Sequence, residues 1–269
     1  MNSEQQYNAE LITLLAGHFL RRDEPNVAWG SAGGFLDTPG VRGYWRGSSV
    51  DNAMNQYDTS GQARTLTAAG LVGTPLPGLY GIAAYADFVR ASAQYYGRAT
   101  EAGLAITEAL TMWTWIRFDA PSTGNNVYYF SKYYQVGAPN QHGYLLYKTN
   151  ANVLGFAIST DGINDVTAVA PAAAYAASVW YFIVGRFTPS TEVALAVGVA
   201  NTGAFTWYRN VAAIPATIWN STESLNVGRG SRTNYLDGQM SKWGLAAYAL
   251  PDVYCWNMFQ QTRAMYETT

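Results

Sequence analysis

The sequence predicts an all-β fold in which two antiparallel sheets form a sandwich, followed by one short helix. From about Ala109 onward, short apolar runs recur between turn residues, and each run has the length of a strand. The runs are rich in β-branched and aromatic residues, which favour strands. The chain of 269 residues is 49% hydrophobic, which is ample for the core of one large β domain. The clearest runs are Ala109–Phe118, Val127–Lys132, Gly143–Lys148, Val153–Ser159, Trp180–Phe187 and Val193–Val199.

Residues 1–40 predict a helix and an extended arm ahead of the sandwich. Ser3–Arg22 carries an apolar stripe at helical spacing, and Pro25 ends this amphipathic helix. The stretch that follows, up to Gly40, is rich in glycine, alanine and proline, which is typical of a linker. We therefore divide the chain into an arm, 1–40, and a sandwich domain, 41–269. The stripe, which must face the sandwich or a partner, consists of Leu11, Leu14, Leu15, His18 and Phe19.

Side-chain alternation within the sandwich indicates which faces are covered. In Val193–Val199 large side chains alternate with alanine and glycine, so the large set is expected to face the core. The small set leaves a smooth outer face or one covered by another layer. In Ala109–Phe118 both faces carry large residues, Trp113 and Trp115 among them, so this strand is covered on both sides or exposes an aromatic platform. Further strands are expected around Val41–Trp45, Arg64–Leu66, Ala86–Arg90, Leu225 and Gln239–Tyr248.

A short C-terminal helix is expected after the last strand. Pro251 and Asp252 open it, and Val253, Trp256 and Phe259 follow at intervals that place them on one packed face. A helix of this length is not stable alone, so it must dock on the sandwich.

The composition favours an assembly or interaction role and gives no sign of nucleic-acid binding. Charged residues make up 13% of the chain, about half the usual share, while tyrosine (20) and tryptophan (9) are abundant. Protein interfaces favour these aromatic residues and are depleted in lysine and glutamate; aromatic filling of a β core is the alternative explanation. The net charge of −2 shows no electrostatic footprint for nucleic acid. The single cysteine, Cys255, excludes an intrachain disulfide and fits a small buried hydrophobe.

The sequence shows no targeting segment. Residues 1–10 are polar and lack the basic region of a secretory signal. The longest uncharged stretch, Val166–Gly185, contains Pro171 and a run of alanines, which fits a loop leading into a strand better than a membrane span. We therefore expect synthesis in the cytoplasm of a host cell, no signal peptide and no membrane partner.

Four landmarks recur in a fixed order and together cover roughly Val41–Tyr266. They are Gly43–Trp45 followed by Tyr57–Thr67, then Ala109–Phe118, then Trp180–Gly185, and finally Leu236–Met240 followed by Ala249–Pro251. In this order they resemble the laminin-G-like jelly-roll domains of the concanavalin A-like lectin and glucanase superfamily. The resemblance implies a two-sheet antiparallel jelly roll over 41–269. The chain departs from that pattern at Gly198, where an aromatic residue is common, and residues 1–40 have no counterpart.

The resemblance also raises the question of glycan hydrolysis, because the same superfamily includes β-glucanases. Their chemistry needs two carboxylates on one strand, in a Glu-x-Asp-x-x-Glu arrangement. This pattern is absent from the sequence, as are the G-x-S-x-G, H-E-x-x-H and phosphate-binding glycine motifs. We therefore expect a non-enzymatic protein. Acids that converge from separate strands keep a glycan-active enzyme as a further alternative.

One tyrosine-rich segment is a candidate glycan site. Tyr133 and Tyr134 offer rings for stacking on a sugar, and Asn140 and His142 offer polar groups for its hydroxyls, all on one predicted long loop. Loops at the ends of a sandwich are where binding residues gather. The alternative is a tyrosine-rich loop packed on a neighbouring subunit.

A second segment is a candidate metal site in a chain that otherwise predicts no cofactor. Asp161, Asn164 and Asp165 offer the carboxylate and amide oxygens that Ca²⁺ prefers. The alternative is a hairpin tip after Val153–Ser159, because Asp-Gly favours such turns.

These observations predict a non-enzymatic structural or decoration protein of a phage virion, in the capsid or the tail. Versions of the jelly-roll fold that this chain resembles occur in bacteriophage virion proteins. The arm without a counterpart, the low charge and the excess of aromatic residues are compatible with assembly into a particle. The arm would dock a lectin-like jelly roll on other virion proteins or on sister copies in a homo-oligomer. The alternative is a carbohydrate-binding module that attaches to a cell-surface glycan. Both roles can hold for one protein.

Overall fold

The computed structural model describes residues 40–47, 55–70, 85–119, 126–134, 141–173, 175–176, 179–230 and 234–267. The chain separates into two units, Met1–Pro39 and Gly40–Thr269. The predicted helix and arm, with Leu11, Leu14, Leu15 and Phe19, lie outside the described residues. Their docking role stays a prediction.

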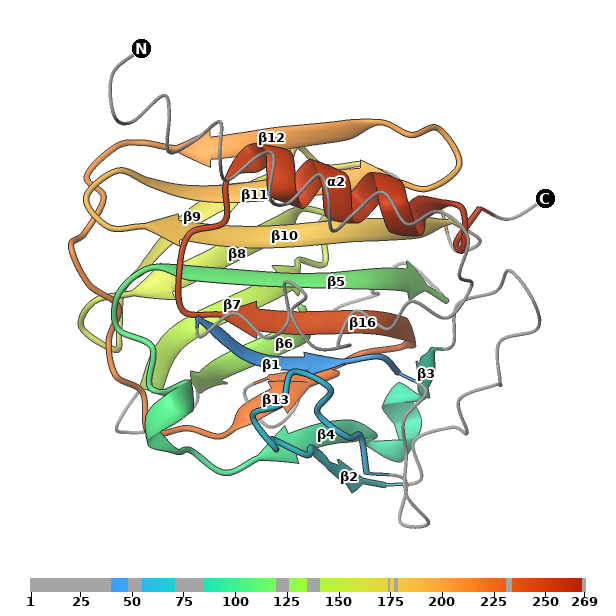
Figure 1. The fold of residues 1–269 in the computed structure, drawn as a ribbon, viewed down its shortest axis with the longest axis horizontal. Helices are drawn as coiled ribbons and strands as arrows, with labels where there is room; N and C mark the ends of the chain where they lie inside the picture. The colour runs from blue at the N-terminus through green and yellow to red at the C-terminus, as the bar shows by residue number, and fades with distance from the viewer. Residues whose placement is uncertain are drawn as a thin grey trace. The chain divides into compact units, whose positions relative to one another are not determined.

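Two antiparallel seven-stranded sheets form a sandwich (Figure 1). This confirms the predicted all-β class. The first sheet contains, in spatial order, β1 (Val41–Trp45), β16 (Gly238–Ala246), β5 (Leu110–Phe118), β10 (Trp180–Thr188), β11 (Glu192–Val199) and β12 (Phe205–Asn210), with β3 (Ala86–Phe88) paired to β16. The second sheet contains β2 (Thr67–Ala69), β4 (Tyr95–Arg98), β13 (Leu225–Val227), β6 (Val127–Tyr134), β7 (Gln141–Lys148), β8 (Leu154–Ser159) and β9 (Asp165–Val169).

Smaller elements complete the described chain. A two-stranded ribbon, β14 with β15, contacts β6 of the second sheet. Two short 3₁₀ turns precede and follow β4 in the sequence. A single α-helix follows the last strand. The bounds are β14 Arg229–Gly230, β15 Asn234–Tyr235, η2 Arg90–Ser92, η3 Ala102–Leu104 and α2 Asp252–Arg263.

The six clear apolar runs all form strands, with ends that shift by at most two residues. The strand expected around Arg64–Leu66 lies slightly later in the chain: Leu66 forms an isolated bridge with Gln56, and β2 begins at Thr67. The cause is Asp58, whose carboxylate accepts a hydrogen bond from the backbone N–H of Arg64 at 3.0 Å and folds the intervening residues into a turn.

The core lies between the two sheets, and aromatic pairs connect them. Trp45 of β1 meets Phe130 of β6 edge-on, with ring centroids 6.2 Å apart. Trp243 of β16 stacks on Tyr96 of β4 at 6.0 Å. All four rings are fully buried. Because each pair joins one sheet to the other, these contacts help to fix the two sheets relative to each other.

Part of the outer face of the first sheet is covered by α2, which lies over β10 and β11 in Figure 1 and also contacts β5. Trp115 of β5 is fully buried and stacks on Tyr266 at 4.1 Å, and its Nε1 donates a hydrogen bond to the Thr262 hydroxyl at 2.9 Å. Gly198 makes room for the helix, since a Cβ there would lie 2.7 Å from Phe259. Of the two possibilities for the aromatic strand, the covered one is therefore correct.

The packed face of α2 differs from the predicted one. Val253 and Trp256 are 50% and 46% exposed, so only Phe259 of the expected trio is buried. The contact face consists of Cys255, Met258, Phe259 and Thr262. Residues spaced three apart drift around a helix of 3.6 residues per turn, whereas the buried residues are spaced three and four apart and stay on one face.

Among the described residues, no helix has the length and apolar character needed to cross a membrane.

The two aromatic residues of α2 should differ sharply in their contribution to stability. Phe259→Ala removes a buried ring beside Trp115 and should lower the free energy of unfolding by about 3–5 kcal/mol. Trp256→Ala, the matched control on the exposed side, should change it by no more than about 0.5 kcal/mol. Urea denaturation followed by circular dichroism measures both values; equal losses would contradict the packing described.

The lone cysteine should be chemically silent in the folded protein. Burial raises the pKa of the Cys255 thiol to about 12, and the thiolate is the form that reacts. At pH 8 we expect iodoacetamide to label the native chain at least roughly a hundredfold more slowly than the chain unfolded in guanidinium chloride. Mass spectrometry over time measures the two rates. Comparable rates would show that α2 leaves the sheet readily.

Candidate functional site

An open pocket of about 490 Å³ lies at the β2–β4–β13 end of the second sheet. Its volume falls within the range of small-molecule sites. The lining combines one aromatic ring with hydroxyl, amide and charged groups. The side chains on which the following argument depends are Thr67, Tyr95, Arg98, Glu101, Asn226 and Arg229.

Strand alternation explains how the pocket forms. In β4, Tyr96 is buried in the core, so its neighbours Tyr95 and Gly97 belong to the opposite face. Gly97 pairs with Thr67 of β2 on one side and with Asn226 of β13 on the other. Because glycine has no side chain, the space between these two residues stays open. A methyl group at Gly97 would lie 3.2 Å from the Tyr95 ring.

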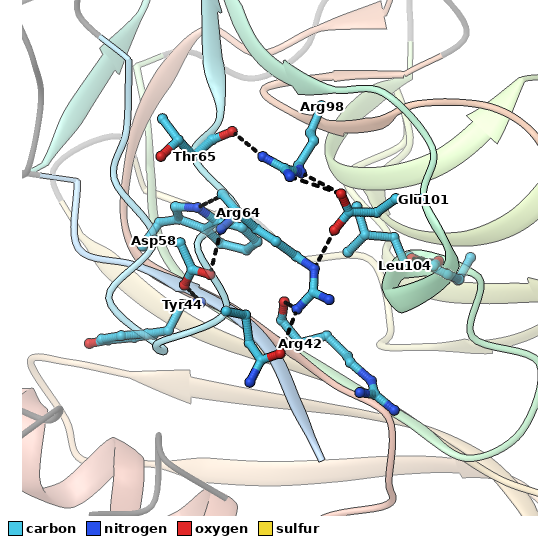
Figure 2. A network of polar contacts seen from close by, with 11 residues as sticks. Arg42, Tyr44, Asp58, Arg64, Thr65, Arg98, Glu101 and Leu104 are labelled. Carbon is cyan, nitrogen blue, oxygen red and sulfur yellow. Dashed lines mark hydrogen bonds and ion pairs between the residues drawn. The ribbon is translucent and has the colours of Figure 1, made fainter. Parts of the chain in front are cut away.

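A network of ion pairs holds one wall of the pocket (Figure 2). Glu101 accepts a hydrogen bond from Arg64 Nε at 2.5 Å through one oxygen, and from Arg98 Nη2 at 2.8 Å through the other. Arg98 also donates to the Thr65 carbonyl at 2.9 Å, and Arg64 donates to the Arg42 carbonyl at 2.7 Å. Three segments distant in the sequence are thereby joined at the pocket.

Opposing influences set the protonation of Glu101. Burial favours its neutral form, but the hydrogen bonds and charges of Arg98 and Arg64 outweigh burial and lower the pKa of Glu101 below its ordinary value of 4.5. The carboxylate is therefore charged at neutral pH, and both guanidinium groups remain bound to it.

Asp58 positions Arg64 for this network. Its carboxylate accepts hydrogen bonds from the backbone N–H groups of Tyr44 at 3.0 Å and Arg64 at 3.0 Å. Trp45 Nε1 adds a hydrogen bond to the Arg64 carbonyl at 2.8 Å. The first sequence landmark thus has a structural role, and it orients a side chain that supports the pocket.

Another part of the pocket lining carries an arginine over an aromatic ring. Arg229 Cζ lies 3.6 Å from the centroid of Tyr95, close enough for a cation–π interaction. Arg229 Nη2 donates to Asn226 Oδ1 at 2.9 Å, and Asn226 Nδ2 donates to the Ser224 carbonyl at 2.9 Å. These contacts hold the guanidinium group and the amide in one orientation at the pocket.

The candidate glycan residues do not lie on one long loop as predicted. Tyr133 and Tyr134 end β6, and His142 belongs to β7, because pairing of the two strands extends to Tyr134 and Gln141. The Tyr133 ring stacks on His142 at 4.2 Å, and both residues are only 3% exposed. Asn140 lies outside the described residues. The buried ring of Tyr133 does not offer its face to a sugar, and the glycan-binding role of this segment stays a prediction.

The candidate calcium ligands point in different directions. Asp161 caps the β8–β9 turn. Its carboxylate accepts hydrogen bonds from the backbone N–H of Asn164 at 2.7 Å, from Asn164 Nδ2 at 2.7 Å and from the backbone N–H of Ile163 at 2.8 Å, and these bonds lower its pKa strongly. Asp165 instead accepts hydrogen bonds from Tyr133 at 2.7 Å and contacts His142 Nδ1 at 2.9 Å. Within the described parts of the chain, no group of three or more acidic, histidine or cysteine residues is arranged to hold a metal.

Comparison with known proteins gives a likeness of fold. No family model matches the chain, and the search of curated proteins finds no match. Among solved structures, the binding domain of botulinum neurotoxin DC in complex with rat synaptotagmin II is similar, with a TM-score of 0.59 and 11% identity over 83% of this chain and 52% of that one. The ligand-binding domain of botulinum neurotoxin serotype D in complex with N-acetylneuraminic acid has a TM-score of 0.58 and 9% identity, over 82% and 51%.

A third similar structure comes from another toxin. The binding domain of Paraclostridial Mosquitocidal Protein 1 has a TM-score of 0.56 and 10% identity, over 82% of this chain and 52% of that one. The chain thus spans about half the length of the solved domains that it matches. At such low identity the likeness shows a shared β-sandwich fold and no more.

Neutralising Glu101 should weaken the pocket wall in a pH-dependent way. Glu101→Gln removes the charge that two arginines share and should lower the free energy of unfolding by roughly 1 kcal/mol at pH 7, since the pair is partly exposed. A carboxyl whose pKa is lowered by folding contributes stability above its unfolded pKa and loses it as the pH falls through the folded value. The difference from wild type should therefore vanish well below pH 4.5.

Glu108→Gln, at an exposed glutamate, is the control and should leave the free energy of unfolding almost unchanged at neutral and at acidic pH. Urea denaturation at pH 7 and at pH 3 measures all three proteins. A Glu101→Gln deficit that persists undiminished at pH 3 would show that the charge of Glu101 is not its source.

Proposed function

We propose that this chain is a non-enzymatic binding module that recognises a saccharide, with the pocket at the β2–β4–β13 end as its site. The observation that carries the proposal is the composition of that pocket. A sugar offers an apolar ring face and many hydroxyl groups, so its site needs an aromatic side chain beside fixed polar groups. Tyr95 supplies the ring, while Thr67, Asn226 and the flanking arginines supply hydrogen-bonding groups.

The similar solved structures support a binding role. They are described as binding or ligand-binding domains, one of them in complex with N-acetylneuraminic acid and another with a protein, synaptotagmin II. A fold by itself does not determine function, so this support is general. The choice of a saccharide rests on the pocket of this chain.

The acids around the pocket support a non-enzymatic role. Glycoside hydrolysis commonly uses two carboxylates that flank the scissile bond. Among the described residues that line this pocket, Glu101 is the one acid, and two arginines bind both of its oxygens. A carboxylate held in this way is a poor general acid, because its pKa lies below the ordinary value.

We further propose that the domain is a laminin-G-like jelly roll of the concanavalin A-like type, displayed on a phage particle. The support is in the sequence: the four ordered landmarks, the low charge, and the arm over residues 1–40 with its apolar stripe. Binding a surface saccharide and decorating a virion are compatible, since a displayed module can attach the particle to a cell.

Removing the aromatic ring should test the site. The ligand for this test is the saccharide that the wild-type chain selects on a glycan array. Tyr95→Ala should weaken its binding by at least about tenfold, because stacking on one aromatic ring contributes on the order of 1–3 kcal/mol. Titration calorimetry with that saccharide gives the affinity. Trp219→Ala, at a 42% exposed aromatic residue outside the pocket lining, should bind as wild type does.

The same experiment compares the pocket with the segment indicated by the sequence. If Tyr133→Ala abolishes binding while Tyr95→Ala does not, the ligand sits at the β6–β7 end and the proposed site is wrong. If the wild-type chain selects no saccharide on the array, the proposed function is wrong.

A further inference from the structure

We propose that the saccharide bound by this pocket is anionic, and that Arg229 binds its carboxylate or sulfate group. This inference rests on the proposed function, since it specifies the ligand of the same site. It follows from how the arginines of the structure are paired, from the donors that Arg229 leaves unused, and from the charge around the pocket.

Arg229 differs from the other arginines at the pocket in having no acidic partner among the residues that the structure describes. Arg64 and Arg98 both bind Glu101. Within the described residues, no carboxylate lies at ion-pair distance from Arg229, whose contacts are the Tyr95 ring and the Asn226 amide oxygen. A partly buried guanidinium group without a counter-charge is costly, and an anion from solution would relieve that cost.

The pairing of two other ring-stacked arginines makes the contrast clear. Arg186 and Arg209 lie 4.4 Å and 4.9 Å from the Trp207 ring centroid. Both also bind carboxylates, Glu192 among them, at 2.5 Å. The two arginines that stack on Trp207 therefore have a carboxylate of the same chain as their counter-charge. At Arg229, which lines the pocket, the described residues supply no such carboxylate, and we assign that place to a ligand.

The donors of Arg229 suit a planar or tetrahedral anion. A guanidinium group has five N–H donors in a fixed fork, and one hydrogen bond, to Asn226, is formed among the described residues. Its Nε is buried and has no partner there. Stacking on Tyr95 and the bond to Asn226 restrict the rotation of the group. Such a preorganised fork binds carboxylate or sulfate oxygens in pairs, at little entropic cost.

The charges at the pocket favour an anion over a neutral sugar. Arg98 and Arg229 line it together with Glu101, and Arg64 stands behind Glu101, so positive charge is in excess. The chain as a whole carries a net charge of −2. The pocket is therefore a positive region on a slightly acidic protein. Its charge attracts anionic ligands, while the net negative charge of the chain disfavours their binding elsewhere.

The experiment compares anionic saccharides with their neutral forms, using the full-length chain. The probes are a uronic-acid oligosaccharide with its carboxyl-reduced form, and a sulfated oligosaccharide with its desulfated form. Titration calorimetry should show at least about tenfold tighter binding to one anionic member than to its neutral partner. The pair that shows the preference identifies carboxylate or sulfate as the source of the anion.

Two arginine variants locate the preference. Arg229→Gln should bind the anionic and neutral forms within about twofold of each other, and Arg229→Lys, which keeps the charge but not the fork, should retain part of the preference. Arg117→Gln is the matched control: Arg117 also lies over a ring, that of Trp180 at 5.8 Å, and also has a buried Nε without a partner in the described structure, but it does not line the pocket. This variant should keep the full preference.

The outcomes separate the inference from the proposed function. If wild type binds neutral and anionic forms equally, and Tyr95→Ala weakens both, the saccharide site stands and the anionic ligand is wrong. A preference that survives in Arg229→Gln would likewise overturn the role of Arg229. If neither form of either probe binds and the array selects no other saccharide, the inference and the proposed function fall together.

Discussion

The rest of the structure depends on the burial of β5, a central strand of the first sheet, on both of its faces. This strand packs against the core on one side and against α2 on the other, so that Met112, Trp115 and Ile116 are all fully buried. A strand with large apolar residues on both faces cannot be exposed to water without a high cost. This sheet therefore has no free face for a ligand over β5, and the pocket lies at the short strands of the second sheet, where one face remains open.

At that end of the sandwich, polar contacts take over part of the role that packing has elsewhere. β2 and β13 have three residues each, too few to fix their surroundings by side-chain packing alone. Asp58 and Glu101 instead bind Arg64 from two directions, and this tie spans residues that are far apart in the sequence. Partly buried, well-satisfied networks of this kind restrict side-chain geometry, which is what a binding pocket requires.

The sequence predicted those features that depend on local patterns and missed those that depend on register. The apolar runs predicted the strands, and the alternation in Val193–Val199 also predicted which of its side chains face the core. The pocket could not, because it exists only where Gly97 pairs with both Thr67 and Asn226, residues far away in the chain. The loop expected around Tyr133 failed for the same reason: strand pairing extended further than its composition indicated. A Tyr-Tyr-Gly-Arg run at 95–98 was the one local signal for an aromatic residue beside an open backbone.

The residues that carry the resemblance and the residues that line the pocket are largely different sets. Asp58 and Trp45 belong to the first landmark, and both make hydrogen bonds that shape the chain around Arg64. Tyr95, Asn226 and Arg229 lie between landmarks. The landmark residues of the first motif therefore hold this end of the sandwich, while the proposed ligand contacts come from side chains that lie outside the landmarks. Identity of 11% or less to the three solved binding domains is compatible with a shared fold, and the specificity proposed for this chain rests on Arg229, which has no carboxylate partner among the described residues, and on the Tyr95 ring next to it.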